Sequence, residues 1–162
     1  MPAEKVLVLN ATGKVGRNVC RALIEAGFEV SGTTRSSTSP LASQGVKPVV
    51  CNYTIRADLD HAFKNTGANK VFVITDYFRA AKSNADVEFQ QGRDAIDAAK
   101  AAGVDHLILM SVADAECFDR HTKHMKAKVE LEKYLPSRAF RSRSCDPAHS
   151  LRISTMPPTG IR

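Results

Sequence analysis

The residues with the clearest chemical potential lie in the segment LNATGKVGRN, residues 9–18. Two glycines, Gly13 and Gly16, stand three residues apart between an apolar run and a stretch with helical spacing. At a turn from a strand to a helix, the first lets the backbone approach a pyrophosphate and the second lets the helix pack closely on the strand. Asn10 stands where a dinucleotide-binding turn usually has its first glycine, and asparagine is the non-glycine residue that best accepts a left-handed conformation. The segment predicts a phosphate-binding loop, although a glycine pair at such a turn also serves packing alone.

The second chemical signal follows the next apolar run. An acidic residue about 20 positions after the loop, which would bind a ribose 2′-hydroxyl, is absent. Instead the run ends in Thr33, Thr34 and Arg35, followed by serines. An arginine without a neighbouring carboxylate suits the 2′-phosphate of NADP. The sequence therefore favours NADP(H) over NAD, and an ordinary surface arginine is the alternative interpretation of Arg35.

The elements that would position these residues alternate along the chain. Apolar strand-like runs and helix-like segments follow one another from residue 5 to residue 135, which predicts a parallel sheet with helices on both faces. We expect an α/β, Rossmann-like, doubly wound sheet of about five strands. The expected strands are 6–9, 28–34, 46–51, 70–75 and 106–111. Helices are expected directly after the glycine loop, where Val15, Val19, Leu23 and Ala26 have helical spacing, and over 57–65, 86–102 and 122–135.

Glycine and proline mark several boundaries within this pattern. Gly27 and Gly103 are placed to end helices, and Pro48 limits its strand to a start or an edge. After Pro136 neither the helical nor the strand period continues. We therefore expect an NAD(P)-binding domain over residues 1–135 and an irregular, basic tail rich in Pro, Ser and Arg over 136–162.

Charge and cysteine content narrow the class of protein. The net charge is +6, but residues 136–162 hold five arginines against one acid, and the rest holds 18 basic against 16 acidic residues. A basic face for nucleic acid therefore has little support. The four cysteines form no CxxC pair, and the first apolar run is too short for a signal peptide or a membrane span. We expect a cytoplasmic protein with reduced thiols and no membrane segment.

Five segments together resemble a known family. They are NATGKVG, TTR after the second strand, VFVITDYF at 71–78, QQGRDAIDAAKAAGVDHLILMS at 90–111 and HMKAKVELEKYL at 124–135. The chain resembles the NmrA-like family, atypical members of the short-chain dehydrogenase/reductase superfamily, and in particular its NADP-sensing, HSCARG-type branch. The resemblance implies an NADP(H)-binding protein that senses redox state or regulates a protein partner. The alternative it implies is an NADPH-dependent oxidoreductase acting on a quinone-like or carbonyl acceptor.

The resemblance also implies roles for individual residues. The pyrophosphate would lie on residues 11–16, the 2′-phosphate on Arg35 and the adenine near Asn52. The full set of implied cofactor-binding residues is Asn10, Ala11, Thr12, Gly13, Lys14, Val15, Gly16, Arg35, Asn52, Thr75, Asp76, Tyr77, Arg93 and Lys126. For Asp76 and Arg93, a solvated loop or helix surface is an equally simple interpretation.

Two departures from the family pattern bear on catalysis. If Lys126 corresponds to the lysine of the superfamily's YxxxK motif, the tyrosine position is Thr122, whose hydroxyl is far less acidic than that of tyrosine. Ser111 and Lys126 remain the candidate catalytic residues, and the alternative interpretation of Ser111 is a strand-end cap.

The second departure is at the end of the chain. Family members continue past the segment matching YLP with a sixth strand and a smaller substrate-side domain, whereas this chain reads SRAFRSRSCDPAHSLRIS. We therefore expect the family pattern to be truncated after about residue 135.

One further cluster could bind a metal. Cys117, His121 and His124 form a C-x3-H-x2-H pattern, but no fourth ligand is evident and the spacing fits none of the usual zinc patterns. Surface histidines before a helix explain it equally well. No metal site is predicted.

Overall fold

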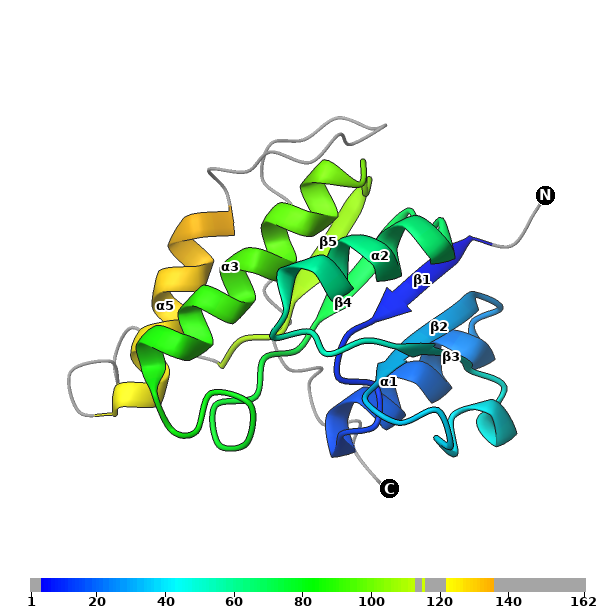
Figure 1. Ribbon diagram of the computed structural model, residues 1–162, viewed down its shortest axis with the longest axis horizontal. Helices are drawn as coiled ribbons and strands as arrows, with labels where there is room; N and C mark the ends of the chain where they lie inside the picture. The colour runs from blue at the N-terminus through cyan, green and yellow to red at the C-terminus, as the bar shows by residue number, and fades with distance from the viewer. Residues whose placement is uncertain (1–3, 113–114, 116–121, 136–162) are drawn as a thin grey trace, which may run out of the picture.

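A parallel five-stranded sheet forms the centre of the structure (Figure 1). The computed structural model describes residues 4–112, 115 and 122–135. The strands are β1 (Lys5–Val8), β2 (Glu29–Thr34), β3 (Lys47–Val50), β4 (Lys70–Val73) and β5 (His106–Leu109). They lie in the order β3-β2-β1-β4-β5, and every neighbouring pair is parallel. The predicted Rossmann-like α/β fold is confirmed.

The strand order places a reversal next to β1. The chain adds β2 and then β3 on one side of β1, then crosses to the other side to add β4 and β5. In the register of the central strands, Leu7 lies opposite Ser31 of β2 and opposite Val71 of β4. In open parallel sheets, ligands bind outside the carboxyl ends of the strands at such a reversal. A ligand-binding site is therefore expected at the edge of the sheet beyond the carboxyl ends of β1 and β4.

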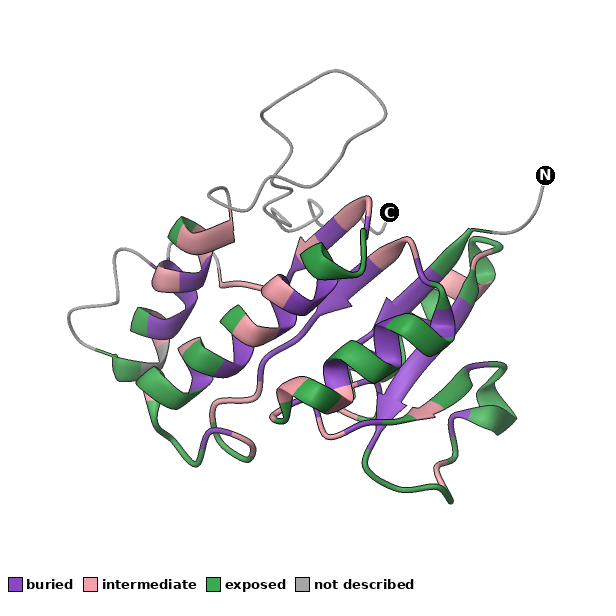
Figure 2. Cartoon of the chain, turned by 45° about the horizontal axis from the view of Figure 1, so that its top comes forward, coloured by how far each residue is buried: buried purple, intermediate pink, exposed green. Residues whose placement is uncertain are grey.

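Helices cover the two faces of the sheet unequally. The helical elements are α1 (Lys14–Glu25), the 3-10 turn η1 (Ala42–Gln44), α2 (Arg56–Thr66), α3 (Ala85–Ala101) and α5 (Lys123–Tyr134). Within the described residues, α1 packs on β1 and β2 over one apolar cluster, which includes Val6 and Val8. The larger cluster, which includes Leu7, lies on the opposite face under α2, α3 and α5. Figure 2 shows buried positions along the central strands and exposed positions on the outer sides of the helices in view.

The boundary signals in the sequence correspond to definite backbone features. Gly27 follows α1 with φ +86° and Gly103 follows α3 with φ +73°, so both adopt the left-handed conformation that ends a helix. At the other end of α3, the side chain of Asn84 accepts hydrogen bonds from the amides of Asp86 and Val87. Pro48 lies in β3, which is an edge strand as predicted.

Two details differ from the sequence prediction. The strands expected over 70–75 and 106–111 end at residues 73 and 109, because the chain leaves the ladder at the carboxyl edge. On α1 the predicted apolar stripe is wrong at its ends: Val15 is 42% exposed and Ala26 is exposed. The buried residues of this helix are Gly16 and Cys20, and at Gly16 the helix lies directly against Asn10 and Ala11 of the preceding loop.

Candidate functional site

The loop from β1 to α1 bends at Asn10. This residue has φ +54°, which confirms the predicted left-handed conformation. Its amide donates a hydrogen bond to the Thr33 hydroxyl of β2 (2.9 Å), and its carbonyl accepts one from the Gly13 amide (3.1 Å). Residues 10–16, hereafter the phosphate loop, are therefore fixed to the carboxyl end of the neighbouring strand.

The two glycines of the phosphate loop, Gly13 and Gly16, differ in how much space a side chain would have. A Cβ on Gly16 would lie 2.3 Å from the Asn10 carbonyl oxygen and 2.8 Å from the Ala11 Cα, so the packing of α1 on the loop demands glycine there. A Cβ on Gly13 would meet the same carbonyl oxygen at 3.3 Å, and the φ of Gly13 is −69°. The packing of the chain nearly tolerates a side chain at Gly13. A ligand lying against the loop gives a further reason for glycine at this position.

The first turn of α1 is open to an anion. Gly13 is the N-cap and supplies no side-chain hydrogen bond, and the first turn contains no acidic residue. The free amides at the start of a helix and the helix dipole both attract negative charge. Lys14 and Arg17 are exposed beside these amides, as is Thr12. The amides of the first turn, together with Thr12 and Lys14, therefore form a surface that suits a pyrophosphate, whereas the predicted residues Ala11 and Gly16 are buried.

At the carboxyl end of β2, beside the phosphate loop, Arg35 carries a positive charge. Arg35 directly follows β2, is exposed and forms no ion pair with any described residue. No Asp or Glu occurs between residues 30 and 57. Asn52, which follows β3, accepts hydrogen bonds from the amide and hydroxyl of Thr54 (3.3 and 2.8 Å). Its side-chain oxygen is thus already used in the turn that leads to α2.

A buried charge cluster that the sequence did not predict lies behind the end of β4. Lys128 of α5 is 4% exposed and Glu88 of α3 is fully buried, and the Lys128 Nζ lies 2.8 Å from the Glu88 Oε1. The Thr75 hydroxyl donates a hydrogen bond to the same carboxylate oxygen (2.6 Å). The oxygen of this hydroxyl also accepts a hydrogen bond from the Lys128 ammonium. The Glu88 Oε2 has no hydrogen-bond partner among the described residues. Thr75 itself is buried, and its hydroxyl is held inside this cluster.

The sequence did contain a signal for the two charged residues. Glu88 precedes Gln91, Gly92 and Ala95 at helical spacing, and these three positions are all buried. A carboxylate in such a stripe must be paired with a cation, because a lone buried charge is too costly. The identity of that cation depends on which helices pack on α3, and these are α2 and α5.

The segment after Thr75 forms a tight turn. The Asp76 carboxylate accepts a hydrogen bond from the Arg79 amide (3.0 Å), and the Asp76 carbonyl accepts one from the Ala81 amide (3.0 Å). The ring of Tyr77 meets the ring of Phe78 edge to face, at 5.1 Å between centroids. Asp76 and Tyr77 are half-buried at the edge where the sequence placed them.

Tyr53 also lies at this edge, and the sequence did not predict it as a site residue. Burial raises the pKa of its hydroxyl, the carboxylates of Asp76 and Glu88 raise it further, and the guanidinium of Arg35 opposes them. Tyr53 therefore lies within electrostatic range of groups that follow β2 and β4 and of a group on α3. The crossover from β3 to α2 brings the tyrosine to this position.

Two residues that the resemblance assigned to the cofactor, Arg93 and Lys126, form contacts between α3 and α5. The Arg93 guanidinium lies 5.6 Å from the ring centroid of Tyr134 and 3.8 Å from the Asp97 carboxylate, where it joins α3 to α5. Lys126 is half exposed, and its Nζ lies 3.3 Å from the Asp86 carboxylate. This hydrogen-bonded carboxylate raises the pKa of Lys126, and Glu130 adds to the effect. No contact among the described residues links Arg93 or Lys126 to the phosphate loop.

The two remaining catalytic positions are not brought to a common point by any described contact. Ser111 follows β5, and its hydroxyl is buried without a hydrogen-bond partner among the described residues. Thr122 is exposed at the start of α5 and forms no capping hydrogen bond with its side chain.

The thiols of the described residues are buried and weakly acidic. Cys20 and Cys51 are free and buried, and burial raises the pKa of the first to about 11 and of the second to about 12. Within the described part of the chain, no group of three or more His, Cys, Asp or Glu could hold a metal ion. Cys117, His121 and the side chain of His124 lie outside the described residues. No helix in the described ranges has the length and apolar character needed to cross a membrane.

Comparison with known proteins identifies the family. The model of the NmrA-like family matches residues 2–144, which is most of the chain. The chain belongs to the NmrA-like family. A relative within the curated proteins, a (4-alkanoyl-5-oxo-2,5-dihydrofuran-3-yl)methyl phosphate reductase of Streptomyces griseus, is 36% identical over 111 residues, which cover 68% of this chain and 36% of the relative.

Solved structures share the fold of this NmrA-like chain. Citrobacter sp. triphenylmethane reductase complexed with NADP(H) has a TM-score of 0.71 and 24% identity, over 83% of this chain and 46% of that one. Escherichia coli NADPH-dependent quinone oxidoreductase QOR2 complexed with NADPH has a TM-score of 0.66 and 25% identity, over 83% and 46%. The chain spans less than half the length of each of these three proteins.

Proposed function

We propose that this NmrA-like chain binds NADP(H) and acts as a redox-responsive regulator, in the manner of the HSCARG-type branch. The observation that carries the proposal is the phosphate loop. Its bend is set by Asn10, its helix start is uncapped, and Gly13 lacks a side chain where internal packing nearly allows one. These features lie beside the reversal between β1 and β4, where a dinucleotide crosses the edge of such a sheet.

In this proposal each part of the site holds one part of the cofactor. The amides of the first turn of α1 bind the pyrophosphate, and Arg35 binds the 2′-phosphate. Asp76 and Tyr77 line the β4 side, with Tyr53 beside them. NADPH, when bound, supplies a hydride donor, and the chain's own residues orient and shield it.

The regulatory role is favoured over catalysis by the positions of the expected catalytic groups. Lys126 is engaged by Asp86, Thr122 carries an alcohol in place of a phenol, and the buried Lys128 is neutralised by Glu88. None of these groups is set up to donate a proton to a carbonyl. A regulator needs only that the oxidised and reduced cofactors be bound differently and that a protein partner respond to the difference.

The alternative is an NADPH-dependent oxidoreductase that acts on a quinone-like or carbonyl acceptor. It is favoured by the comparison with the Escherichia coli protein, an NADPH-dependent quinone oxidoreductase crystallised with NADPH. Ser111, whose hydroxyl is buried and unpartnered among the described residues, would then contact the nicotinamide or the substrate.

Calorimetric titration of the 162-residue protein with NADPH and, separately, NADH tests the proposal. We expect saturable binding with NADPH favoured at least tenfold, a difference of about 1.4 kcal/mol. Binding of neither cofactor would refute it. NADPH consumption with a panel of quinones then separates the two roles: tight binding without turnover supports the regulator, and turnover supports the oxidoreductase.

A further inference from the structure

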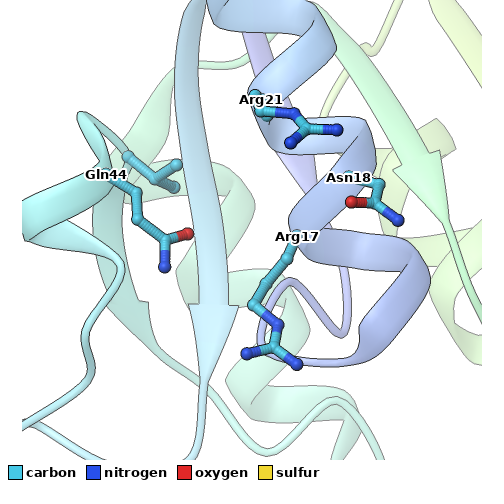
Figure 3. Close-up of a pocket in the computed structure, with 5 residues that line it drawn as sticks. Arg17, Asn18, Arg21 and Gln44 are labelled. Atoms are coloured by element: carbon cyan, nitrogen blue, oxygen red, sulfur yellow. The ribbon is translucent and has the colours of Figure 1, made fainter.

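An open depression of about 440 Å³ lies beside α1, between this helix and the segment that precedes β3 (Figure 3). Its size is within the range of ligand sites in proteins. The residues that line it are Arg17, Asn18, Arg21, Gln44 and Val46. Figure 3 shows the three α1 residues on one side and Gln44 on the other. None of the lining residues belongs to the predicted cofactor site.

The polar side chains around the depression are free to bind a ligand. Arg17, Asn18 and Gln44 are exposed, and no hydrogen bond or ion pair joins their side chains to another described residue. Arg21 is 73% exposed, and its guanidinium lies 4.0 Å from the Glu25 carboxylate, which is too far for a hydrogen bond. The depression therefore offers guanidinium and amide groups that the chain itself does not use.

The charge beside the depression is positive. Its lining residues come from two segments, residues 5–24 and 30–57, which contain no Asp or Glu. Lys14 and Lys47 of the same segments are exposed and add to the charge of the two lining arginines. A ligand with a complementary potential must therefore be acidic.

The spacing of the two arginines indicates how the acidic groups of such a ligand are arranged. Arg17 and Arg21 are four residues apart on α1, a rise of about 6 Å along the helix. In an extended peptide, side chains on the same side are about 6.6–6.8 Å apart. An extended segment that runs along α1 can therefore place acidic side chains at positions i and i+2 against the two guanidinium groups.

The two side-chain amides also favour an extended peptide. A helical segment uses its backbone amides and carbonyls internally, whereas an extended segment keeps them free for other partners. Asn18 and Gln44 each offer both a donor and an acceptor to such a backbone. An extended acidic segment thus matches the charged and the neutral polar groups of the depression together.

A long nucleic acid fits this surface less well than a short peptide. Residues 1–135 hold 18 basic against 16 acidic residues, and none of these acids lies in residues 5–24 or 30–57. The remaining part of residues 1–135 therefore carries a net negative charge, which repels a polyanion that extends past the depression. A short acidic segment avoids this repulsion.

We propose that the depression beside α1 binds an extended acidic segment of a protein partner, whose acidic side chains at alternate positions pair with Arg17 and Arg21. The inference goes beyond the proposed function, because binding of this segment needs no bound dinucleotide. A partner of this chemistry is also what the proposed regulator requires.

Fluorescence anisotropy with the whole chain at low ionic strength tests the proposal, because exposed charge pairs are least screened there. The probe is a short labelled peptide in which glutamate alternates with threonine. The same residues in block order keep the charge and change the spacing, and a peptide of alternating glutamine and threonine removes the charge. We expect saturable binding of the first peptide, binding at least threefold weaker for the second and none for the third.

Substitutions on the protein test the two arginines. Arg17→Gln and Arg21→Gln should each weaken binding of the alternating peptide at least threefold, and the double variant at least tenfold. Both side chains are exposed, so the fold should be kept. Lys100→Gln is the matched control for net charge, because Lys100 is exposed on α3, which covers the opposite face of the sheet. It should change the affinity less than twofold.

The proposal is overturned if the alternating peptide does not bind saturably, if the block peptide binds as tightly, or if Lys100→Gln costs as much as the arginine variants. Saturating NADPH should leave the peptide affinity within twofold, and displacement of the peptide would place it on the cofactor site instead. Duplex DNA that binds more tightly and weakens in the same arginine variants would assign the surface to nucleic acid. The NADPH titration described above tests the proposed function separately, since it contains no peptide.

Discussion

Replacing Lys128 by methionine tests the buried charge cluster most directly. Lys128 is 4% exposed and its partner Glu88 is fully buried, so the substitution leaves a carboxylate without its cation and without access to water. Among the described residues, the Thr75 hydroxyl is the one hydrogen-bond donor that remains for Glu88. Removal of one partner from a buried ion pair costs about 3–5 kcal/mol. The total stability of a domain is about 5–15 kcal/mol, so the loss is a large fraction of it.

Urea unfolding followed by circular dichroism measures this loss as a difference in the free energy of unfolding. Lys126→Met is the matched control, because Lys126 lies on the same helix in a solvent-exposed ion pair, and such pairs contribute little to stability. The double variant Lys128→Met, Glu88→Gln removes both charges and should recover at least half of the loss. The reasoning is refuted if Lys128→Met costs no more than Lys126→Met, or if the double variant is less stable than the single one.

Other substitutions test the loop and the thiols. Gly16→Ala puts a Cβ 2.3 Å from a backbone oxygen and should lower stability by about 1–3 kcal/mol in urea unfolding. Gly13→Ala should cost less than Gly16→Ala in the same assay but weaken NADPH binding at least tenfold; unchanged binding would contradict a ligand at this glycine. Arg35→Asp should reverse the ratio of NADPH to NADH affinity, and an unchanged ratio would remove Arg35 from the 2′-phosphate site. Because their pKa values are raised to about 11 and about 12, Cys20 and Cys51 should resist alkylation at pH 8.5 in the folded protein and react in urea, as peptide mapping would record. Modification of either at equal rates in both conditions would contradict their burial.

The sequence predicted the sheet because its signals were local. Alternation of apolar runs and helical segments needs no knowledge of distant contacts, and Gly27 and Gly103 mark helix ends by backbone conformation alone. The same is true of Asn10, whose left-handed conformation follows from its position in the loop. Pro48 limited its strand to the edge for an equally local reason, the missing amide.

The charged part of the site was less predictable because it depends on packing between helices. Whether Lys126 or Lys128 faces the protein interior depends on which side of α5 meets α3, because two positions along a helix differ by a rotation of about 200°. For the same reason, the contact of Arg93 of α3 with the ring of Tyr134 of α5 could not be predicted, and its assignment to the cofactor stays a prediction. Tyr53 was missed because the crossover from β3 to α2 carries it across the edge of the sheet, which spacing does not reveal.

The position of β1 at the centre of the sheet has a consequence for synthesis on the ribosome. Its partner β2 is complete by Thr34, but its other partner, β4, begins only at Lys70. While the intervening residues are translated, one side of β1 exposes unpaired backbone groups, which is the kind of edge that recruits foreign strands. The nascent chain therefore passes through an interval of high aggregation risk that closes only when β4 has left the exit tunnel.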